Sequence, residues 1–449
     1  MARKKFKRAF SLQPDEDILD WNTLTDEDFA AASQQEKEDF IQDRKSVSYW
    51  KDAWRRLRKN TVAMVAMGVL IIIFLFAFLG PVLVPYGYAQ FNAGAENLHP
   101  WHYTLADQQR LNAEMAERTG ASSLTPEEAW AKAQEEAAAQ GKTLTPVDKA
   151  KIMAAAKSAA QGQDAAGEDV KESDVRRELG IKAHFGGYSV KELERQANGE
   201  SVFPHVFGTD KFGRDIMVRV MVGTRVSMIV GVCAALLVLV IGALYGSISG
   251  YFGGKVDAVM QRIVEMIYSI PEVLVILLIS TVLGISLTEY VNTNPNGPFA
   301  GVIVVLGSNL IAMFIAFGLL YWVTMSRIIR GQIIQLKEQE YVTAARALGA
   351  KGPRIIKRHL LPNCVGQIVV TTCLQIPSAI FLESFLSFLG VGVSAPLTSL
   401  GSMCTEALGG LYTYPYRMFF PAGILSIMIL AFNLFGDGLR DALDPRLKK

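Results

Sequence analysis

The sequence predicts an all-α integral membrane protein that crosses the bilayer about six times. Half of its 449 residues are hydrophobic, and they gather into long runs that carry few charges. A run of about 18 apolar residues or more is long enough to cross a bilayer as a helix. Six stretches meet that requirement: 61–79, 226–254, 263–287, 299–325, 361–382 and 418–436.

The distribution of Lys and Arg predicts the orientation of these helices. Basic residues cluster before the first run and between the fourth and fifth runs, whereas loops 288–298 and 391–416 contain none. Because positive charges near short loops mark the cytoplasmic side, we expect the N-terminus, loop 326–360 and the C-terminus in the cytoplasm. The first run follows 60 mostly polar residues, which favours an uncleaved anchor in the cytoplasmic membrane over a secretory signal.

These features divide the chain into five regions. The N-terminal one is a charged cytoplasmic extension with Trp50, Trp54 and Leu57 on one helical face, a pattern typical of a helix that lies on the membrane surface. The regions are the extension 1–60, a first transmembrane helix 61–80, an extracytoplasmic loop with a helical insert 86–216, a five-helix core 217–441 with loop 326–363, and a cytoplasmic tail 442–449.

The insert is expected to be an accessory rather than a domain of its own. Capping patterns that begin at Thr125 and Thr145 predict helices at 126–139 and 146–160. Large apolar residues are scarce there, which favours packing on the rest of the molecule or on a partner.

Patterns for enzymatic chemistry are weak. His99 and His102 have a metal-like spacing, but no Cys or third His is close, so an ordinary polar loop is favoured over a zinc site. Gly141-Lys-Thr143 lacks the first Gly of a phosphate-binding loop, because Glu136 stands in its place. The four cysteines form no CxxC pair. We therefore expect no catalytic residues, no metal and no cofactor in this chain.

The loop between the fourth and fifth runs has a distinctive pattern. Good helix formers fill 339–348, the small Ala344 and Ala345 leave room for another protein to approach, and Gly349 suits a left-handed helix end. A second helix, 353–360, is expected to end before Pro362. The pattern thus predicts an elbow of two helices between two membrane spans, in which Lys337 is expected to matter little.

This elbow resembles the coupling motif of ABC-type import permeases, Glu-Ala-Ala-x3-Gly-x9-Ile-x-Leu-Pro. Thr343 replaces the Glu of this motif and His359 replaces its Ile, and the surrounding residues are similar to those of the oligopeptide and dipeptide branch of the family. Three further stretches resemble that branch: Phe207-Gly-Thr-Asp-Lys-Phe-Gly-Arg-Asp215, Glu383-Ser-Phe-Leu-Ser-Phe-Leu-Gly390 and Phe432-Asn-Leu-Phe-Gly-Asp-Gly-Leu-Arg-Asp-Ala-Leu-Asp-Pro445.

The resemblance implies a type I ABC importer-like fold and half of a pore that moves peptides by alternating access. The sequence leaves open whether the cargo is a dipeptide, a longer peptide, a nickel chelate or another small solute. It implies as partners a second homologous permease subunit, two ATPase subunits that hold ATP and magnesium, an extracytoplasmic solute-binding protein and membrane lipid; nucleic acid is not among them. The residues implied to contact an ATPase subunit are Glu340, Tyr341, Ala344, Ala345, Arg346, Gly349, Leu361 and Pro362.

Other charged residues have two interpretations. Three glutamates lie in or beside the spans: Glu265, Glu272 and Glu383. They either line a solute path or gate, or have a structural role in which they pair with other charges and cap helices. The structural role is slightly favoured for Glu383. Asp210 and Asp215 fit turn and N-cap positions before the second span better than a solute contact. Two other functions are alternatives to the importer. An ion-driven transporter would use the three glutamates as ion sites, and a membrane enzyme would need a nucleophile with its base. ATP-dependence of uptake distinguishes the importer from both.

Overall fold

The computed structural model describes residues 49–119, 130, 172–393 and 397–443. The chain divides into two compact units, residues 1–55 and 56–449. In the first unit, the described residues 49–55 belong to helix α3 (Tyr49–Leu57), on which Trp50 and Trp54 are exposed. The second unit contains the membrane helices.

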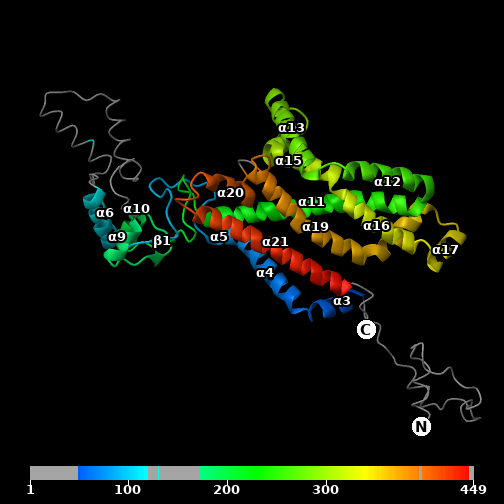
Figure 1. Ribbon diagram of the computed structural model, residues 1–449, viewed down its shortest axis with the longest axis horizontal. Helices are drawn as coiled ribbons and strands as arrows, with labels where there is room; N and C mark the ends of the chain where they lie inside the picture. Colours follow the sequence, from blue (N-terminus) through cyan, green and yellow to red (C-terminus); the bar gives the residue numbers. More distant parts are fainter. Residues whose placement is uncertain (1–48, 120–129, 131–171, 394–396, 444–449) are drawn as a thin grey trace, which may run out of the picture. The chain divides into compact units, whose positions relative to one another are not determined.

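The second unit is built from helices with one short two-stranded sheet among its described residues (Figure 1). The elements are α4 (Thr61–Phe78), α5 (Gly80–Leu83), β1 (Trp101–His102), α6 (Leu105–Thr119), α9 (Glu172–Glu178), β2 (His184–Phe185), α10 (Val190–Ala197), α11 (Ile216–Phe252), α12 (Gly254–Tyr268), α13 (Glu272–Thr293), α14 (Ala300–Leu306), α15 (Ser308–Leu320), α16 (Trp322–Leu336), α17 (Glu340–Ala347), α18 (Gly352–Ile355), η3 (Ile356–Leu360), η4 (Leu361–Cys364), α19 (Val365–Phe388), α20 (Leu400–Leu408) and α21 (Tyr416–Leu443).

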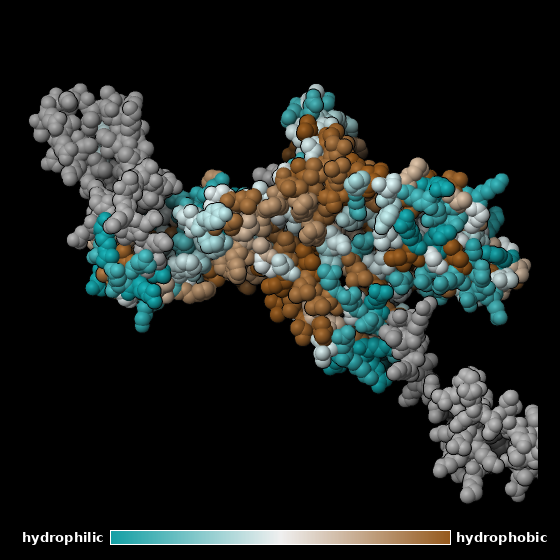
Figure 2. Space-filling model, in the orientation of Figure 1, coloured by the Kyte–Doolittle hydropathy of each residue, from teal (hydrophilic) through white to brown (hydrophobic). Residues whose placement is uncertain are grey.

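Six helical segments are long and apolar enough to cross a membrane, which confirms the expected number. They are Thr61–Phe78, Ile216–Phe252, Glu272–Thr293, Ser308–Leu336, Gly352–Phe388 and Tyr416–Leu443. Apolar side chains cover their middle parts, and polar side chains gather toward their ends (Figure 2). An outward-facing apolar surface of this kind matches the hydrocarbon of a bilayer.

Helix α11 is the centre of the bundle, and its glycines explain how it packs. Gly242, Gly246 and Gly250 stand four residues apart on one face, and a Cβ at each would collide with α16. Small residues at this spacing let two membrane helices approach closely enough for backbone contact. At about 1.5 Å per residue, the 37 residues of α11 span about 55 Å, so its two ends serve two separate regions.

Two of the expected spans contain a break. The stretch 263–287 is divided between α12 and α13, because Pro271 lacks a backbone N–H and disfavours helical geometry at the residue before it. The stretch 299–325 is interrupted at Gly307, which has φ +85°, and the apolar segment continues instead from Ser308 to Leu336. The apolar runs therefore predicted the number of spans correctly but did not predict where these breaks lie.

The insert carries a small core of its own. Tyr103, Leu111 and Val175 are buried together between α6 and α9, and β1 pairs with β2 in antiparallel register. Of the expected helices 126–139 and 146–160, Trp130 is described and is helical, and the remainder lies outside the described residues. The side of the membrane on which the insert lies stays a prediction.

Candidate functional site

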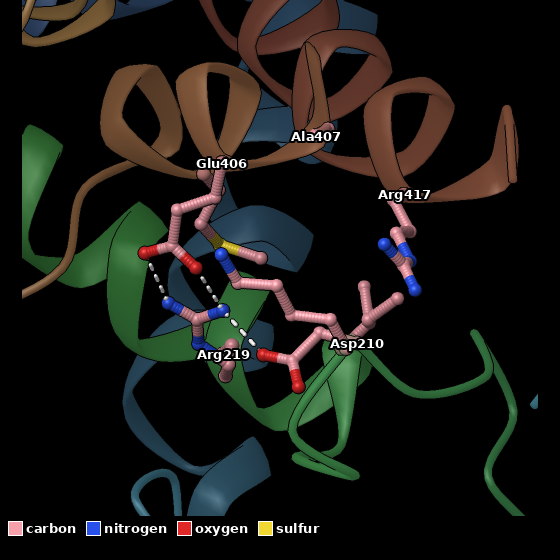
Figure 3. Close-up of a pocket in the computed structure, with 8 residues that line it drawn as sticks. Asp210, Arg219, Glu406, Ala407 and Arg417 are labelled. Atoms are coloured by element: carbon pink, nitrogen blue, oxygen red, sulfur yellow. Dashed lines mark hydrogen bonds and ion pairs between the residues drawn. The ribbon is translucent and has the colours of Figure 1, made fainter. Parts of the chain in front are cut away.

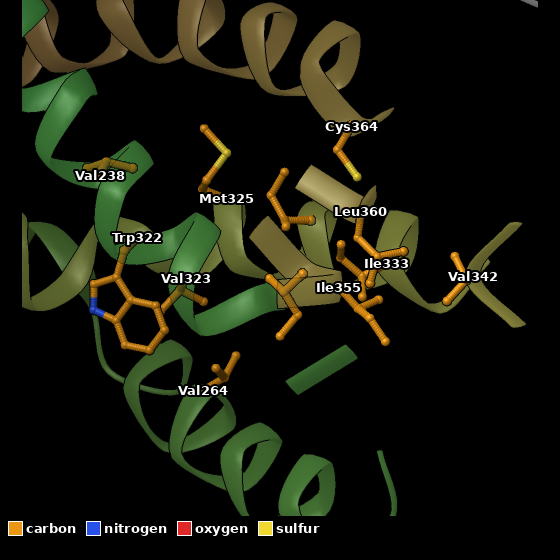
Figure 4. Close-up of a cluster of buried hydrophobic side chains, with 12 residues drawn as sticks. Val238, Val264, Trp322, Val323, Met325, Ile333, Val342, Ile355, Leu360 and Cys364 are labelled. Carbon is orange, nitrogen blue, oxygen red and sulfur yellow. The ribbon is translucent and has the colours of Figure 1, made fainter. Parts of the chain in front are cut away.

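The motif-bearing loop folds into a bent helical segment at the C-terminal end of α11, which we call the α17 elbow (residues 337–364). Val342 of α17 is fully buried in an apolar cluster with Ile333, Ile355 and Leu360 (Figure 4). Burial of one aliphatic side chain contributes about 1.5–3 kcal/mol relative to exposure. Val342 therefore anchors α17 to the bundle.

The opposite face of α17 is open. Ala344 is exposed, Ala345 is half-buried, and 89% of the Leu348 surface is exposed. Gly349 ends the helix with φ +83°, as expected, and a Cβ there would meet empty space. Backbone conformation, rather than crowding inside this chain, thus favours glycine at this position.

The other expected contact residues of the elbow are not all alike. Glu340 lies exposed in the first turn of α17, where a negative charge suits the helix dipole. The Tyr341 hydroxyl accepts a hydrogen bond from Asn363 at 3.3 Å, and the Arg346 guanidinium lies 5.5 Å from the centre of the Tyr251 ring. Leu361 is half-buried against the apolar cluster, whereas Pro362 is exposed.

The helix expected to end before Pro362 does not end there. α18 continues into the π-helical turn η3 and the 3₁₀ turn η4, which leads directly into α19. Proline tolerates the first turn of a helical segment, and Pro362 occupies that position in η4. The change of helix type at Leu361 accommodates the ring, so the elbow and α19 form one continuous helical path.

Besides the Arg346–Tyr251 contact, two further contacts join the elbow to α11. Lys337 Nζ donates a hydrogen bond to the Gly250 carbonyl at 3.1 Å, in the last turn of α11. Gly352 lies so close to the Tyr251 ring that a Cβ would be 2.9 Å from it. The sequence offers no sign of this hydrogen bond of Lys337, so the expectation that Lys337 matters little does not include it.

A partly buried ion pair holds α12 against α16 near the same end. Arg330 donates from Nε and Nη2 to the two oxygens of Asp257, at 2.6 and 2.5 Å. The Arg330 hydrogen bonds outweigh partial burial and hold the pKa of Asp257 below its usual value. This bidentate geometry is the strong form of a carboxylate–guanidinium contact.

The three glutamates lie in very different surroundings. Glu383 is fully buried and accepts hydrogen bonds from Ser227 of α11 at 2.7 Å and from Ser387 at 2.8 Å. Glu272 begins α13, at the break after Pro271. Glu265 is not inside a span as expected: it lies on α12 in an exposed ion pair with Arg262. Their roles in a solute path stay predictions.

Ion pairs that involve the buried Arg219 and Asp210 tie the N-terminal end of α11 to its surroundings (Figure 3). Arg219 of α11 contacts Asp210 at 2.7 Å and binds both oxygens of Glu406 on α20, at 2.8 and 2.9 Å. Arg214 contacts the same two carboxylates at 2.7 and 2.9 Å. We call Asp210, Arg214, Arg219 and Glu406 the outer ion cluster, because the charge distribution predicts that this end of α11 lies outside.

A buried histidine joins the insert to the same helix end. His205 Nδ1 lies 2.7 Å from Asp215 and Nε2 lies 3.3 Å from Glu192 of α10. Burial alone would lower its pKa, but the two carboxylates raise the pKa of His205 to about 9. Asp215 also accepts from the Val218 N–H as the N-cap of α11, which confirms the capping interpretation of this residue.

Comparison with known proteins accounts for most of this chain. Residues 239–449 match the family described as the binding-protein-dependent transport system inner membrane component, and residues 48–100 match the N-terminal TM domain of oligopeptide transport permease C. The dipeptide transport system permease protein DppC of Bacillus subtilis is 32% identical over 429 residues, which cover 95% of each chain. The chain belongs to the oligopeptide and dipeptide permease family of ABC transporters.

Other relatives agree with this assignment. The oligopeptide transport system permease protein OppC of Bacillus subtilis is 46% identical over 245 residues, 55% of this permease and 73% of that protein. A solved chain of the MetNI methionine ABC transporter covers 51% of this permease and 96% of its own length at 17% identity, with a TM-score of 0.36, a likeness too low to carry an argument.

The permease contains site features that its sequence patterns do not reveal. His205, Glu192 and Glu406 stand out in no motif, because their partners are distant in the sequence or are ordinary acidic residues. Asp215 offers the one useful signal, since its N-cap position before α11 predicts capping but not the contact with His205.

His99 and His102, which have a metal-like spacing in the sequence, have different contacts in the structure. His99 stacks on Trp101, and His102 contacts the Gly186 carbonyl at 2.6 Å. Within the described ranges, no group of three metal-ligating residues occurs.

Proposed function

We propose that this chain is the permease subunit of an ATP-driven, binding-protein-dependent importer that moves peptides across the cytoplasmic membrane. The observation that carries the proposal is the open face of α17, which presents Ala344, Ala345 and Gly349 outward while Val342 anchors the helix. Small residues on an anchored helix suit a seat in the groove of another protein. The names of its relatives, which specify oligopeptide and dipeptide transport, support peptides as the cargo.

Separate ATPase subunits would drive the movement through the α17 elbow. Lys337 and Gly352 connect the elbow to the end of α11, and η4 connects it to α19. A displacement of α17 would therefore move two membrane helices together. Because a partner shifts such an equilibrium only through different affinities for its two states, the ATPase pair must grip the elbow differently before and after hydrolysis.

The assembly would contain a second homologous permease subunit, two ATPase subunits with ATP and magnesium, and an extracytoplasmic solute-binding protein, in a lipid membrane. This chain would hydrolyse no ATP itself. The test is uptake of a labelled peptide into proteoliposomes that hold the complete complex, with binding protein added outside. Uptake should require ATP hydrolysis and the binding protein, without any ion gradient. Uptake that follows an imposed proton or sodium gradient in the absence of ATP would instead support an ion-driven transporter.

The charge distribution supports an orientation with both termini and the elbow in the cytoplasm and the insert outside. Cysteines introduced one at a time at the exposed positions Leu348 and Gln196 test it with an impermeant thiol reagent on intact cells. The background lacks the exposed Cys233 (Cys233→Ser) and is itself the control for the three other native cysteines. Gln196→Cys should react and Leu348→Cys should react only after permeabilisation. The reverse pattern would invert the orientation.

The insert is proposed to contact the solute-binding protein or the outer face of the permease pair. Its small core and its His205 link to α11 support a fixed accessory rather than a loose tether. Deletion of residues 105–180 should weaken binding-protein affinity while the membrane core still assembles. Unchanged affinity and uptake would leave the insert as a passive spacer.

A further inference from the structure

A small cavity adjoins the outer ion cluster at the beginning of α21. Its volume is about 20 Å³, enough for one water-sized particle. The charged residues that line it are Asp210, Lys211, Arg219, Glu406 and Arg417. Three of the five are cations, so the cavity has an excess of positive charge.

The two carboxylates of this lining are already occupied. Asp210 accepts from the Phe212 and Arg214 backbone N–H groups through Oδ1 and from two guanidinium groups through Oδ2. Glu406 accepts from Arg219 through both oxygens and also from Arg214. Neither carboxylate forms an ion pair with Arg417, whose side chain lies apart from the dashed network in Figure 3.

Arg417 is left with unused donors in a buried position. Only 8% of its surface is exposed, yet its Nε and Nη2 atoms have no hydrogen-bond partner. Its guanidinium carbon lies 4.4 Å from the centre of the Tyr414 ring, a contact that satisfies neither N–H group. The Arg417 side chain also interacts with the Tyr416 hydroxyl, but Nε and Nη2 still lack an acceptor. Donors of a buried cation without an acceptor are unfavourable, which favours an anionic or polar partner at this position.

Two further observations indicate a positive potential at the same place. Arg417 lies in the first turn of the 28-residue helix α21, whose N-terminus adds a partial positive charge. His99, whose ring centre is 5.1 Å from that of Tyr416, has a pKa lowered by burial and by the charge of Arg417. Its Nδ1 atom is also buried without a partner.

We propose that this cavity binds a small monovalent anion of the size of chloride, held by the free donors of Arg417 and by the ammonium group of Lys211. The cavity has room for one small particle, and its excess positive charge favours an anion over a water molecule. Such an anion would complete the outer ion cluster and join the start of α21 to α20 and α11. The proposal is independent of the transported solute.

Bromide is the probe for this site, because it replaces chloride and scatters X-rays anomalously. Crystals of the full-length permease in sodium bromide should show an anomalous peak next to Arg417 Nε and Nη2. In parallel, the thermal unfolding midpoint should rise with sodium chloride or bromide and not with sodium gluconate at equal ionic strength. Sodium formate distinguishes the two kinds of small anion: stabilisation by formate as well would extend the site to carboxylates.

Three variants assign the effect to this cavity. Arg417→Gln should abolish the halide-dependent shift, and Lys211→Gln should weaken apparent halide affinity about tenfold, the equivalent of about 1.4 kcal/mol. Arg214→Gln is the matched control, since its guanidinium already has two carboxylate partners, and it should keep the shift. If Arg417→Gln fails to fold, the proposal is still tested by the bromide peak in the wild type and by the halide affinity of Lys211→Gln.

The proposal is overturned if no bromide peak appears next to Arg417 in crystals that contain other ordered bromide ions. It is also overturned if gluconate stabilises the permease as well as chloride does, or if Arg417→Gln folds and retains the full halide-dependent shift. A peak that survives in Arg417→Gln would mark an adventitious surface ion.

Discussion

The two ends of α11 attach their neighbouring segments in different ways. At its C-terminal end, the α17 elbow is held by buried apolar side chains, among them Val342, Ile355 and Leu360, and turns small side chains outward. At its N-terminal end, Arg219 and Asp215 hold buried charges in fixed hydrogen-bond geometry. Apolar contacts are non-directional, whereas charge networks tolerate little displacement. This difference is consistent with the proposed roles of the two ends, in which a partner grips and moves the elbow while the other end holds its place.

The largest expected effect separates the two ends directly. Gly349→Val adds a β-branched side chain where φ is +83°, which opposes the backbone conformation by about 1–2 kcal/mol and adds bulk to the open face of α17. Co-purification of ATPase subunits and peptide-stimulated ATP hydrolysis should fall by about tenfold or more, equivalent to at least about 1.4 kcal/mol of lost coupling. Ala345→Glu should do the same without backbone strain.

Gly199→Val is the matched control for this experiment. Gly199 has φ +89° and open space around it, so the strain is the same, but it lies after α10 in the insert. ATPase assembly should survive this change. Normal assembly in both Gly349→Val and Ala345→Glu would show that the elbow is not where the ATPase binds.

A second prediction concerns Glu383, which joins α11 to α19 through serine hydroxyls. Glu383→Leu leaves those buried hydroxyls without an acceptor and should lower the free energy of unfolding by about 1–3 kcal/mol per unsatisfied group. Glu383→Gln keeps a carbonyl oxygen and should retain most of the stability. Thermal unfolding in detergent measures both. If Glu383→Gln were stable but unable to support peptide uptake, a role in the solute path would replace the structural one.

A third prediction is a loss of stability at alkaline pH at the insert end. The folded pKa of His205, about 9, is above its ordinary value of 6.5, so its stabilising contribution is fully present below pH 6.5 and is lost as the pH rises through 9. The loss should be on the order of 3 kcal/mol at most. The unfolding midpoint of wild type should therefore fall over this range more steeply than that of His205→Gln. Parallel pH profiles would contradict a charged His205 in the folded state.

The smallest effect is expected for Glu265, the glutamate that the fold places outside the spans. Its partner Arg262 has 82% of its side-chain surface exposed, and such pairs contribute about 0–1 kcal/mol. Glu265→Gln should leave both stability and peptide uptake unchanged. A clear loss of uptake in this variant would return Glu265 to the solute path.

The sequence by itself determined the class of the protein and the position of its elbow. Six apolar runs predicted the number of spans, because hydrocarbon accepts only long uncharged helices. The spacing of Ala344, Ala345 and Gly349 located α17 and its left-handed end, because helix termination by glycine is a local property. The family resemblance carried by these residues is confirmed by the relatives.

Only the tertiary structure decided which distant residues meet. Apolar runs could not locate the breaks at Pro271 and Gly307, since a break changes the backbone and leaves the mean hydropathy of its surroundings unchanged. Nor could they show that the helical path continues past Pro362. Arg219 and Glu406 lie 187 residues apart in the chain, and no local pattern marks them as partners. Such ion pairs follow from the packing of α11 against α20, which depends on the whole fold.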